Sequence, residues 1–275
     1  ELFLEPGESA EKELYITNRL GQEMTFKIDI EDFVGSRDTS ETVVLLGDKR
    51  GPYSLKDYIK PEAAEFTLKN KQRIILPVTI AVPYDAEPGG LYGTVLVSTV
   101  PAASDKETEA GALSGGAVTI TRLGTLMFVR VKGEVEEEGS LKSIGTKGKK
   151  FFESGPIYFD LVFENNGNVH LNPYGIIEIK NSFGSSVGEV MIDPWFALPD
   201  SLRLREVSWN KNFLFGRYTA EAKINRGYND IIDEASVSFW VIPWKIILAG
   251  FAALTLILFF FKWIFSKFEI RKKVI

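Results

Sequence analysis

The sequence predicts an all-β protein with two immunoglobulin-like β-sandwiches followed by one C-terminal transmembrane helix. Over most of the 275 residues, apolar and polar residues alternate, as they do in strands with one buried and one solvated face. Clusters of Gly, Pro and Asn separate these segments at short spacing, and a helical period is almost absent. After Val241 the sequence becomes almost continuously apolar, which is typical of a helix that crosses a bilayer.

Residues 1–132 are predicted to form the first sandwich. Its clearest strand spans residues 24–30, where the apolar side chains of Phe26, Ile28 and Ile30 share one face and charged side chains occupy the other. This pattern fits a strand that packs on a second sheet through one face only.

Pro77 interrupts another alternating segment, residues 74–82, which carries an apolar residue at every even position. Because proline has no N–H to donate to a ladder, we expect an edge strand or a bulge there. Residues 54–59 have the spacing of a single helical turn, with Ser54 as its N-cap. Two segments rich in β-forming residues complete the sandwich, residues 91–100 and 117–131.

Two segments are predicted to lie outside the strands. Residues 102–116 are mainly small and polar, and they bury too little surface to offset their ordering entropy, so we expect a mobile loop. Residues 133–139 read Gly-Glu-Val-Glu-Glu-Glu-Gly and form an acidic connector. We interpret this connector as a solvated linker rather than a cation site.

Residues 140–241 are predicted to form the second sandwich. Turns rich in Asn, Gly and Ser separate its strands at residues 165–168 and 181–188. Two of its strands show strict alternation of the buried face, one through Ile157, Phe159, Leu161 and Phe163 and the other through Tyr218, Ala220, Ala222 and Ile224.

Residues 242–265 are predicted to be the transmembrane helix. Its central part carries no charge and no strong helix breaker, and a helix satisfies its own backbone groups in lipid. Basic residues lie mainly beyond its second end, so the positive-inside rule makes residues 266–275 a cytoplasmic basic tail and places the ectodomain outside. The predicted anchoring residues are Trp244, Lys245, Lys262, Trp263, Lys267, Arg271, Lys272 and Lys273.

The predicted localisation is therefore the cell membrane, crossed once, with the lipid bilayer as one partner. This topology requires a signal peptide, which we expect to have been removed before Glu1. The chain has a net charge of −5; six basic residues and one acid after Val241 contribute +5 and leave −10 on the ectodomain. Nucleic acid is not an expected partner, because backbone binding needs clustered Lys and Arg.

The sequence predicts a protein that is not an enzyme and that has no cofactor or metal. It has no cysteine, which excludes disulfides, thiol nucleophiles and Cys-ligated metals. Its one histidine, His170, has no nucleophile signature beside it that would indicate a catalytic triad. We interpret the clustered acids as solvated surface, with a hydrolase that uses two carboxylates from distant strands as an alternative. These acids are Asp29, Glu31, Asp32, Asp230, Asp233 and Glu234.

Four residues are candidates for contact with a ligand or partner: Trp195, Phe196, Trp209 and His170. Aromatic rings in the loops of a sandwich offer large contact area at low entropic cost. The plainer interpretation is that the three aromatic rings plug the ends of the core and that His170 bonds to a nearby carbonyl at a strand end.

Short turn and strand motifs resemble a known family. They are Pro6-Gly7-Glu8, the strands at 26–30 and 74–83, Gly89-Gly90-Leu91-Tyr92-Gly93, and residues 163–173. Together with the C-terminal helix and basic tail, this layout resembles the WxL-interacting cell-surface proteins of Gram-positive bacteria. The N-terminal domain of that family is similar to the immunoglobulin-like fold of pilus chaperones. The resemblance implies that the first domain contacts peptidoglycan and that the second contacts partner surface proteins.

The predicted function is that of a membrane-anchored extracytoplasmic binding or scaffold protein. It would attach or organise components of the cell envelope, namely wall polymer or cell-surface proteins. The first alternative is a chaperone-like assembly factor for pilus or surface-layer subunits that acts by β-strand pairing. The second alternative is the envelope hydrolase that uses paired carboxylates.

Overall fold

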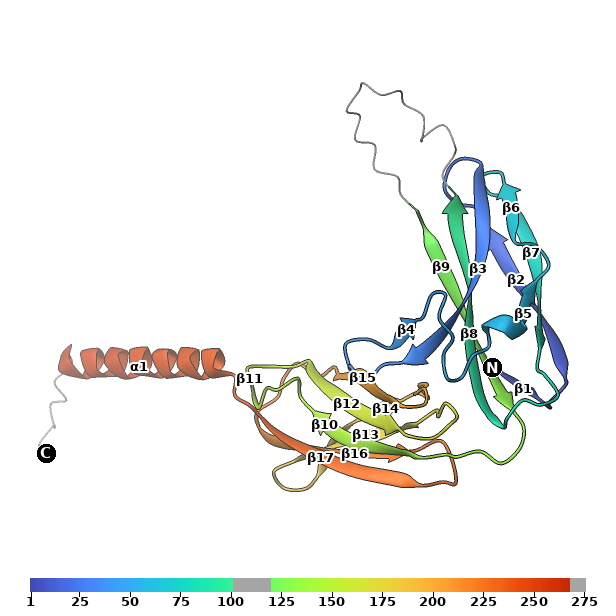
Figure 1. Ribbon diagram of the computed structural model, residues 1–275. Coiled ribbons are helices and arrows are strands. Elements are labelled where there is room, and N and C mark those ends of the chain that lie inside the picture. The colour runs from blue at the N-terminus through green and yellow to red at the C-terminus, as the bar shows by residue number, and fades with distance from the viewer. Residues whose placement is uncertain (101–119, 268–275) are drawn as a thin grey trace, which may run out of the picture.

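The computed structural model describes residues 1–100 and 120–267, and it consists of two β-sandwiches and one helix (Figure 1). The two sandwiches meet at an angle, and the second lies between the first sandwich and the helix. The predicted fold class is confirmed. The loop expected at residues 102–116 and most of the tail expected at 266–275 lie outside the described residues.

The first sandwich is built from strands that lie within residues 2–131. One sheet has the order β1-β9-β8-β3-β4, with β6 paired to β3, and the other has the order β2-β7-β5. The strands are β1 (Leu2–Leu4), β2 (Ser9–Thr17), β3 (Met24–Gly35), β4 (Val43–Leu45), β5 (Ile59–Pro61), β6 (Glu65–Leu68), β7 (Arg73–Ala81), β8 (Gly89–Val100) and β9 (Arg122–Val131).

The second sandwich uses residues 139–241 and runs directly into the helix. Its sheets have the orders β10-β12-β15 and β11-β17-β16-β13-β14. Its elements are β10 (Gly139–Gly145), β11 (Phe151–Phe152), β12 (Ile157–Asn165), β13 (Tyr174–Asn181), β14 (Ser186–Ile192), β15 (Ser201–Trp209), β16 (Gly216–Asn225), β17 (Ile232–Val241) and the helix α1 (Trp244–Lys267).

The alternating segments bury the side chains that the sequence predicts. On β7 the even positions Leu76, Val78 and Ile80 are buried and pack in the core of the first sandwich. On β12 the four predicted apolar residues are all fully buried, and on β16 Tyr218, Ala220, Ala222 and Ile224 are buried as well.

The prediction for Pro77 is wrong, because β7 is the central strand of its sheet and pairs with β2 without a register shift. Glu62 N–H donates to Pro77 O at 3.0 Å, just beyond the end of the short strand β5. Since N–H and C=O of one strand residue point to the same side, the missing N–H of Pro77 also faces this end of β5. Proline is tolerated there because the ladder stops beside it.

The predicted helical turn is present as a 3-10 helix, Lys56–Tyr58, but Ser54 does not cap it. The cap residue is Leu55, and the side chain of Asp32 on β3 accepts hydrogen bonds from Leu55 N at 3.0 Å and Lys56 N at 2.9 Å. Asp32 is fully buried, so this tertiary cap replaces the local one that the sequence suggested.

A small aromatic cluster joins the two sandwiches. Tyr92 on β8 and Phe128 on β9 pack against Phe196 and His170 of the second sandwich, and the Phe128 ring lies 5.2 Å from each of those two rings. Backbone bonds also cross between the sandwiches, from Gly90 N to Asn168 O at 2.9 Å and from Leu202 N to Ser36 O at 2.9 Å. Buried rings together with backbone bonds hold the two sandwiches in one arrangement.

Candidate functional site

The outer edge of β9 is only partly covered. Among the described residues, β9 pairs on one side with β8 along its whole length, but on the other side it meets β1 only at Val129–Val131. The segment Arg122–Phe128 therefore has one open edge within the described part of the chain. An edge of this kind presents unpaired N–H and C=O groups to a second chain.

The register shows which backbone groups are open. Thr99 N donates to Thr121 O at 3.0 Å, and the β8–β9 register continues from this pair without a shift. Odd-numbered residues of β9 therefore bond to β8, whereas Arg122, Gly124 and Leu126 direct N–H and C=O away from it. The bond from Lys132 N to Leu4 O supports this parity, because it shows an even residue facing the β1 side.

The inner face of β9 extends beyond the core that covers it. Met127, Val129 and Val131 are buried in the core of the first sandwich, but Leu123, on the same face, is 71% exposed. A leucine side chain gains roughly 1.5–3 kcal/mol when it moves from water into an apolar environment. The exposed part of β9 thus combines an open ladder with an uncovered apolar residue.

An apolar groove of about 490 Å³ lies beside this part of β9, between it and the end of β2. Its apolar lining includes Leu123, Phe26, Val97, Ile16 and Leu20. We call it the β9 groove. Its other wall, β2, also has an outer edge without a partner among the described strands. The groove therefore lies between the edges of two sheets and has the shape and polarity that an extended apolar segment needs.

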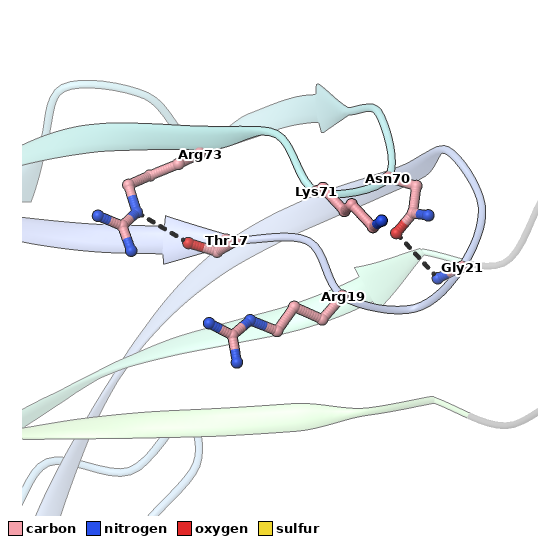
Figure 2. A pocket seen from close by; sticks show the side chains of 6 residues that line it. All are labelled: Thr17, Arg19, Gly21, Asn70, Lys71 and Arg73. Carbon is pink, nitrogen blue, oxygen red and sulfur yellow. Dashed lines mark hydrogen bonds between the residues drawn. The ribbon is translucent and has the colours of Figure 1, made fainter.

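A basic pocket adjoins the β9 groove. The segments that line it, at the end of β2 and between β6 and β7, lie at the end of the first sandwich away from the second (Figure 1). The pocket has a volume of about 630 Å³ and shares Thr17 and Arg19 with the groove. Figure 2 shows Arg19, Lys71 and Arg73 on its walls, with Arg73 Nε bonded to Thr17 Oγ1 at 3.1 Å. None of these three cations belongs to an ion pair within residues 1–100 and 120–267. The pocket is suited to a carboxylate or another anion.

The structure places Trp195 and Trp209 in the core of the second sandwich. Trp195 is 4% exposed and packs on Phe163 with ring centroids 6.2 Å apart. Trp209 is 6% exposed and lies against Tyr218 and the backbone of Gly188. This agrees with the plainer interpretation of the two rings, and a contact between them and a partner stays a prediction.

The other two candidates, His170 and Phe196, meet at the junction of the sandwiches. His170 N donates to Tyr92 Oη at 2.7 Å, and the His170 ring also contacts Tyr92 Oη at 3.2 Å through Nδ1 and Glu1 Oε1 at 2.8 Å through Nε2. These partners are the side chains of Tyr92 and Glu1, and not the nearby carbonyl that the sequence pattern predicts. Burial lowers the pKa of His170 below its ordinary value, while Glu1 opposes this shift. Burial likewise raises the pKa of Tyr92 well above its usual range.

Most of the clustered acids form hydrogen bonds or ion pairs within the protein. Asp32 caps the 3-10 helix, Asp29 pairs with Lys27 at 2.7 Å, and Glu31 pairs with Arg122. In the second group, Asp233 forms a bidentate pair with Arg226, which raises the pKa of that guanidinium. Among the described residues, no group of three or more acidic or histidine side chains could hold a metal ion.

Helix α1 is long and apolar enough to span a bilayer over Trp244–Ser266. Its side chains are not covered by the rest of the protein. Trp244 and Lys245 lie in its first turn, and Lys262 and Trp263 lie near its other end. Lys267 is its last described residue, and Arg271, Lys272 and Lys273 lie outside the described residues.

No protein-family model matches the chain, and no curated protein matches it. Solved structures with a similar fold include the class 5 fimbriae chaperone CfaA, with 14% identity, a TM-score of 0.39, and coverage of 88% of this chain and 95% of that one. The CsuC–CsuE chaperone–tip subunit complex of Acinetobacter baumannii has 12% identity, a TM-score of 0.38, and coverage of 85% and 94%. The Pseudomonas aeruginosa CupB2 chaperone has 10% identity, a TM-score of 0.37, and coverage of 87% and 97%. At these identities the similarity concerns the fold alone.

Proposed function

We propose that this protein is a membrane-anchored extracytoplasmic binding protein that captures an extended segment of another protein by β-strand pairing along β9. The single observation that carries the proposal is the part of β9 whose outer edge no other described strand covers, with Leu123 exposed beside an apolar groove. An incoming strand would complete the ladder at Arg122, Gly124 and Leu126 and would bury its own alternate side chains in the groove.

Both the backbone hydrogen bonds and the apolar contacts of this interaction contribute to affinity. Each new backbone hydrogen bond contributes about 0.5–1.5 kcal/mol net, and each apolar side chain buried in the groove contributes about 1.5–3 kcal/mol. Since the edge strand is already part of a sheet, only the partner segment must become ordered on binding. This restricts the entropic cost to one side.

The β9 groove favours strand pairing over recognition of a wall polymer. A polysaccharide needs many polar groups on the protein, whereas most of the exposed surface of this groove is apolar, although four threonines, Asn18 and Arg19 also line it. Among the predicted functions, the geometry therefore supports best the chaperone-like alternative, with pilus or surface-layer subunits as candidate partners. Attachment of peptidoglycan, and kinship with the WxL-interacting proteins, remain proposals that rest on the sequence motifs.

The proposed function includes a membrane anchor, which is helix α1. We infer that α1 crosses the cell membrane once, with the sandwiches outside and the basic tail in the cytoplasm, because Lys and Arg gather beyond its C-terminal end. Strand pairing would then take place outside the membrane, on the sandwich that is separated from α1 by the second sandwich.

The test uses the full-length protein in detergent and a short synthetic peptide that alternates valine with threonine. We expect the peptide to bind and to protect the amides of Arg122, Gly124 and Leu126 from hydrogen exchange. Amides of the odd residues already bond to β8 and serve as an internal control. A matched peptide with proline at alternate positions keeps the apolar content but has fewer N–H groups, and we expect it not to bind.

Equal binding of the two peptides, or protection elsewhere in the chain without a change on β9, would contradict strand pairing. Binding of both peptides in the groove without amide protection would indicate a purely apolar docking site.

A further inference from the structure

A cluster of exposed aromatic side chains surrounds the end of the second sandwich from which α1 emerges. The rings come from strand β11, two loops, the end of β17 and the first residue of the helix, and they are between 43% and 93% exposed. We call this cluster the aromatic rim, and its members are Phe151, Phe183, Phe213, Phe215, Trp240 and Trp244.

Strand register brings the rim residues to the same end. Phe151 lies opposite Trp240 in the β11–β17 ladder, and Gly216, which follows Phe215, lies opposite Val241. The hairpin that carries Phe183 is joined to the same end, because Ser182 Oγ donates to Arg217 O at 3.1 Å. Segments far apart in the sequence thus place exposed rings around one exit point.

The helix is fixed closely to this end. Only Ile242 and Pro243 separate β17 from α1, and Ile242 N donates to Phe152 O at 2.8 Å. Lys245 in the first turn forms an ion pair with Glu153 at 2.8 Å. The rim therefore cannot move far from the point at which α1 enters the bilayer.

A lipid surface is the occupant that this arrangement fits. Exposed aromatic rings in water are unfavourable when they gather on one surface, whereas the headgroup region of a bilayer favours them. Exposed cations flank the rim, which suits the phosphate groups of anionic lipids. These cations are Lys149, Lys150, Lys211, Arg217 and Lys245.

We propose that the aromatic rim penetrates the headgroup region of the membrane and holds the second sandwich upright on the bilayer. This inference rests on the proposed membrane anchor but not on strand pairing. It gives the second sandwich a role of its own, because contact between the aromatic rim and the bilayer would keep the β9 groove at a set distance from the membrane.

The chain has no cysteine, so single cysteines can be introduced into the full-length protein without background. The test attaches an environment-sensitive fluorophore to Phe183→Cys, Phe213→Cys, Phe259→Cys or Met191→Cys and reconstitutes each in phosphatidylcholine–phosphatidylglycerol vesicles with nitroxide-labelled lipids. Phe259 reports on α1 itself. Met191 is the matched control, because it is 75% exposed in the same sandwich but pairs with Ile176, away from the rim.

We expect headgroup nitroxides to quench the labels at 183 and 213 several-fold more than the label at 191, and acyl-chain nitroxides to quench the label at 259. Quenching at 259 without quenching at 183 and 213 would contradict penetration of the headgroup region by the aromatic rim, while it would still support α1 as a membrane anchor. No quenching at 259 would overturn the anchor and this inference together. A blue shift at 183 and 213 without nitroxide quenching would identify a protein partner instead and would also overturn it.

A second measurement guards against insertion caused by the fluorophore itself. In the triple variant Phe183→Ser, Phe213→Ser and Phe215→Ser, a label at Tyr84→Cys in the first sandwich reports its distance to an acceptor on the lipid surface. We expect this distance to become broadly distributed in the triple variant and narrow in the parent. Equal distributions would contradict the proposal.

Discussion

The two sandwiches use the same alternating pattern but bury it to different extents. On β12 in the second sandwich, Ile157, Phe159, Leu161 and Phe163 are all fully buried. On β9 in the first sandwich, the inward-facing series is buried from Met127 onward, whereas Leu123 is largely exposed. Strand alternation determines which face a side chain occupies, but coverage depends on how far the opposite sheet extends. The inner face of β12 is thus fully covered, whereas the described residues leave the inner face of β9 uncovered at Leu123.

The largest expected effect is on stability, and it contrasts the buried core of the second sandwich with the exposed part of β9. Phe163→Ala should lower the free energy of unfolding by about 3–5 kcal/mol, because it leaves a cavity in a fully packed core. Leu123→Ala should change it by no more than about 0.5 kcal/mol, since the side chain is already in water. Denaturant unfolding of the full-length protein, followed by circular dichroism, compares the two, because all five tryptophans lie in the second sandwich and the helix and do not report on the first sandwich. Similar losses in both variants would mean that the groove is covered in solution.

The junction between the sandwiches should respond to added volume. A Cβ atom at Gly35 would lie 2.4 Å from Ser201 Cβ and 2.9 Å from Leu198 Cβ. Gly35→Ala should therefore destabilise the junction by about 1–3 kcal/mol. Small-angle scattering should then show a less fixed angle between the sandwiches. Ser201→Gly added to Gly35→Ala should restore part of the loss, and a complete lack of rescue would place the strain elsewhere.

Proline on the open edge should weaken peptide binding without unfolding the sandwich. Arg122→Pro removes one outward N–H but no bond of the β8–β9 ladder, so affinity for the alternating peptide should fall roughly tenfold. Arg122→Gln is the matched control, because it also loses the ion pair with Glu31 but keeps the N–H. Fluorescence anisotropy compares the two variants. An equal fall in both would assign the effect to the ion pair.

The basic pocket should give a preference for peptides that end in a negative charge, and this effect on affinity should be smaller than that of Arg122→Pro. Lys71→Glu should weaken binding of an alternating peptide that ends in aspartate by a few-fold, and a peptide that ends in asparagine should be much less affected. Added salt should reduce the difference between the peptides, because exposed charges are screened. If both peptides respond equally, the bound strand does not reach the pocket.

The smallest effect concerns pH at the junction. The pKa of His170 is lowered in the folded protein by burial, so the unfolded chain binds the proton more readily. Stability from this group is fully present above the ordinary pKa of about 6.5 and is lost as pH falls through 6.5 toward the folded pKa. Unfolding as a function of pH should show this loss in the parent but not in His170→Gln. An opposite slope would mean that the ion pair with Glu1 outweighs burial.

The sequence by itself determined the buried faces of the long strands and the apolar stretch of α1. Alternation at period two identifies the inner faces of β7, β12 and β16, because each side chain's face follows from backbone geometry alone. The apolar stretch of α1 is equally local, since its length and composition suffice to predict a membrane span.

Only the tertiary structure decided what those faces meet. The groove at Leu123 depends on where β2 and β9 end relative to each other. Pro77 is tolerated in a central strand because the short strand β5 stops beside it. His170 meets Tyr92 and Glu1, which lie 78 and 169 residues away in the sequence. These outcomes depend on pairing between distant strands, and no periodicity within one segment encodes it.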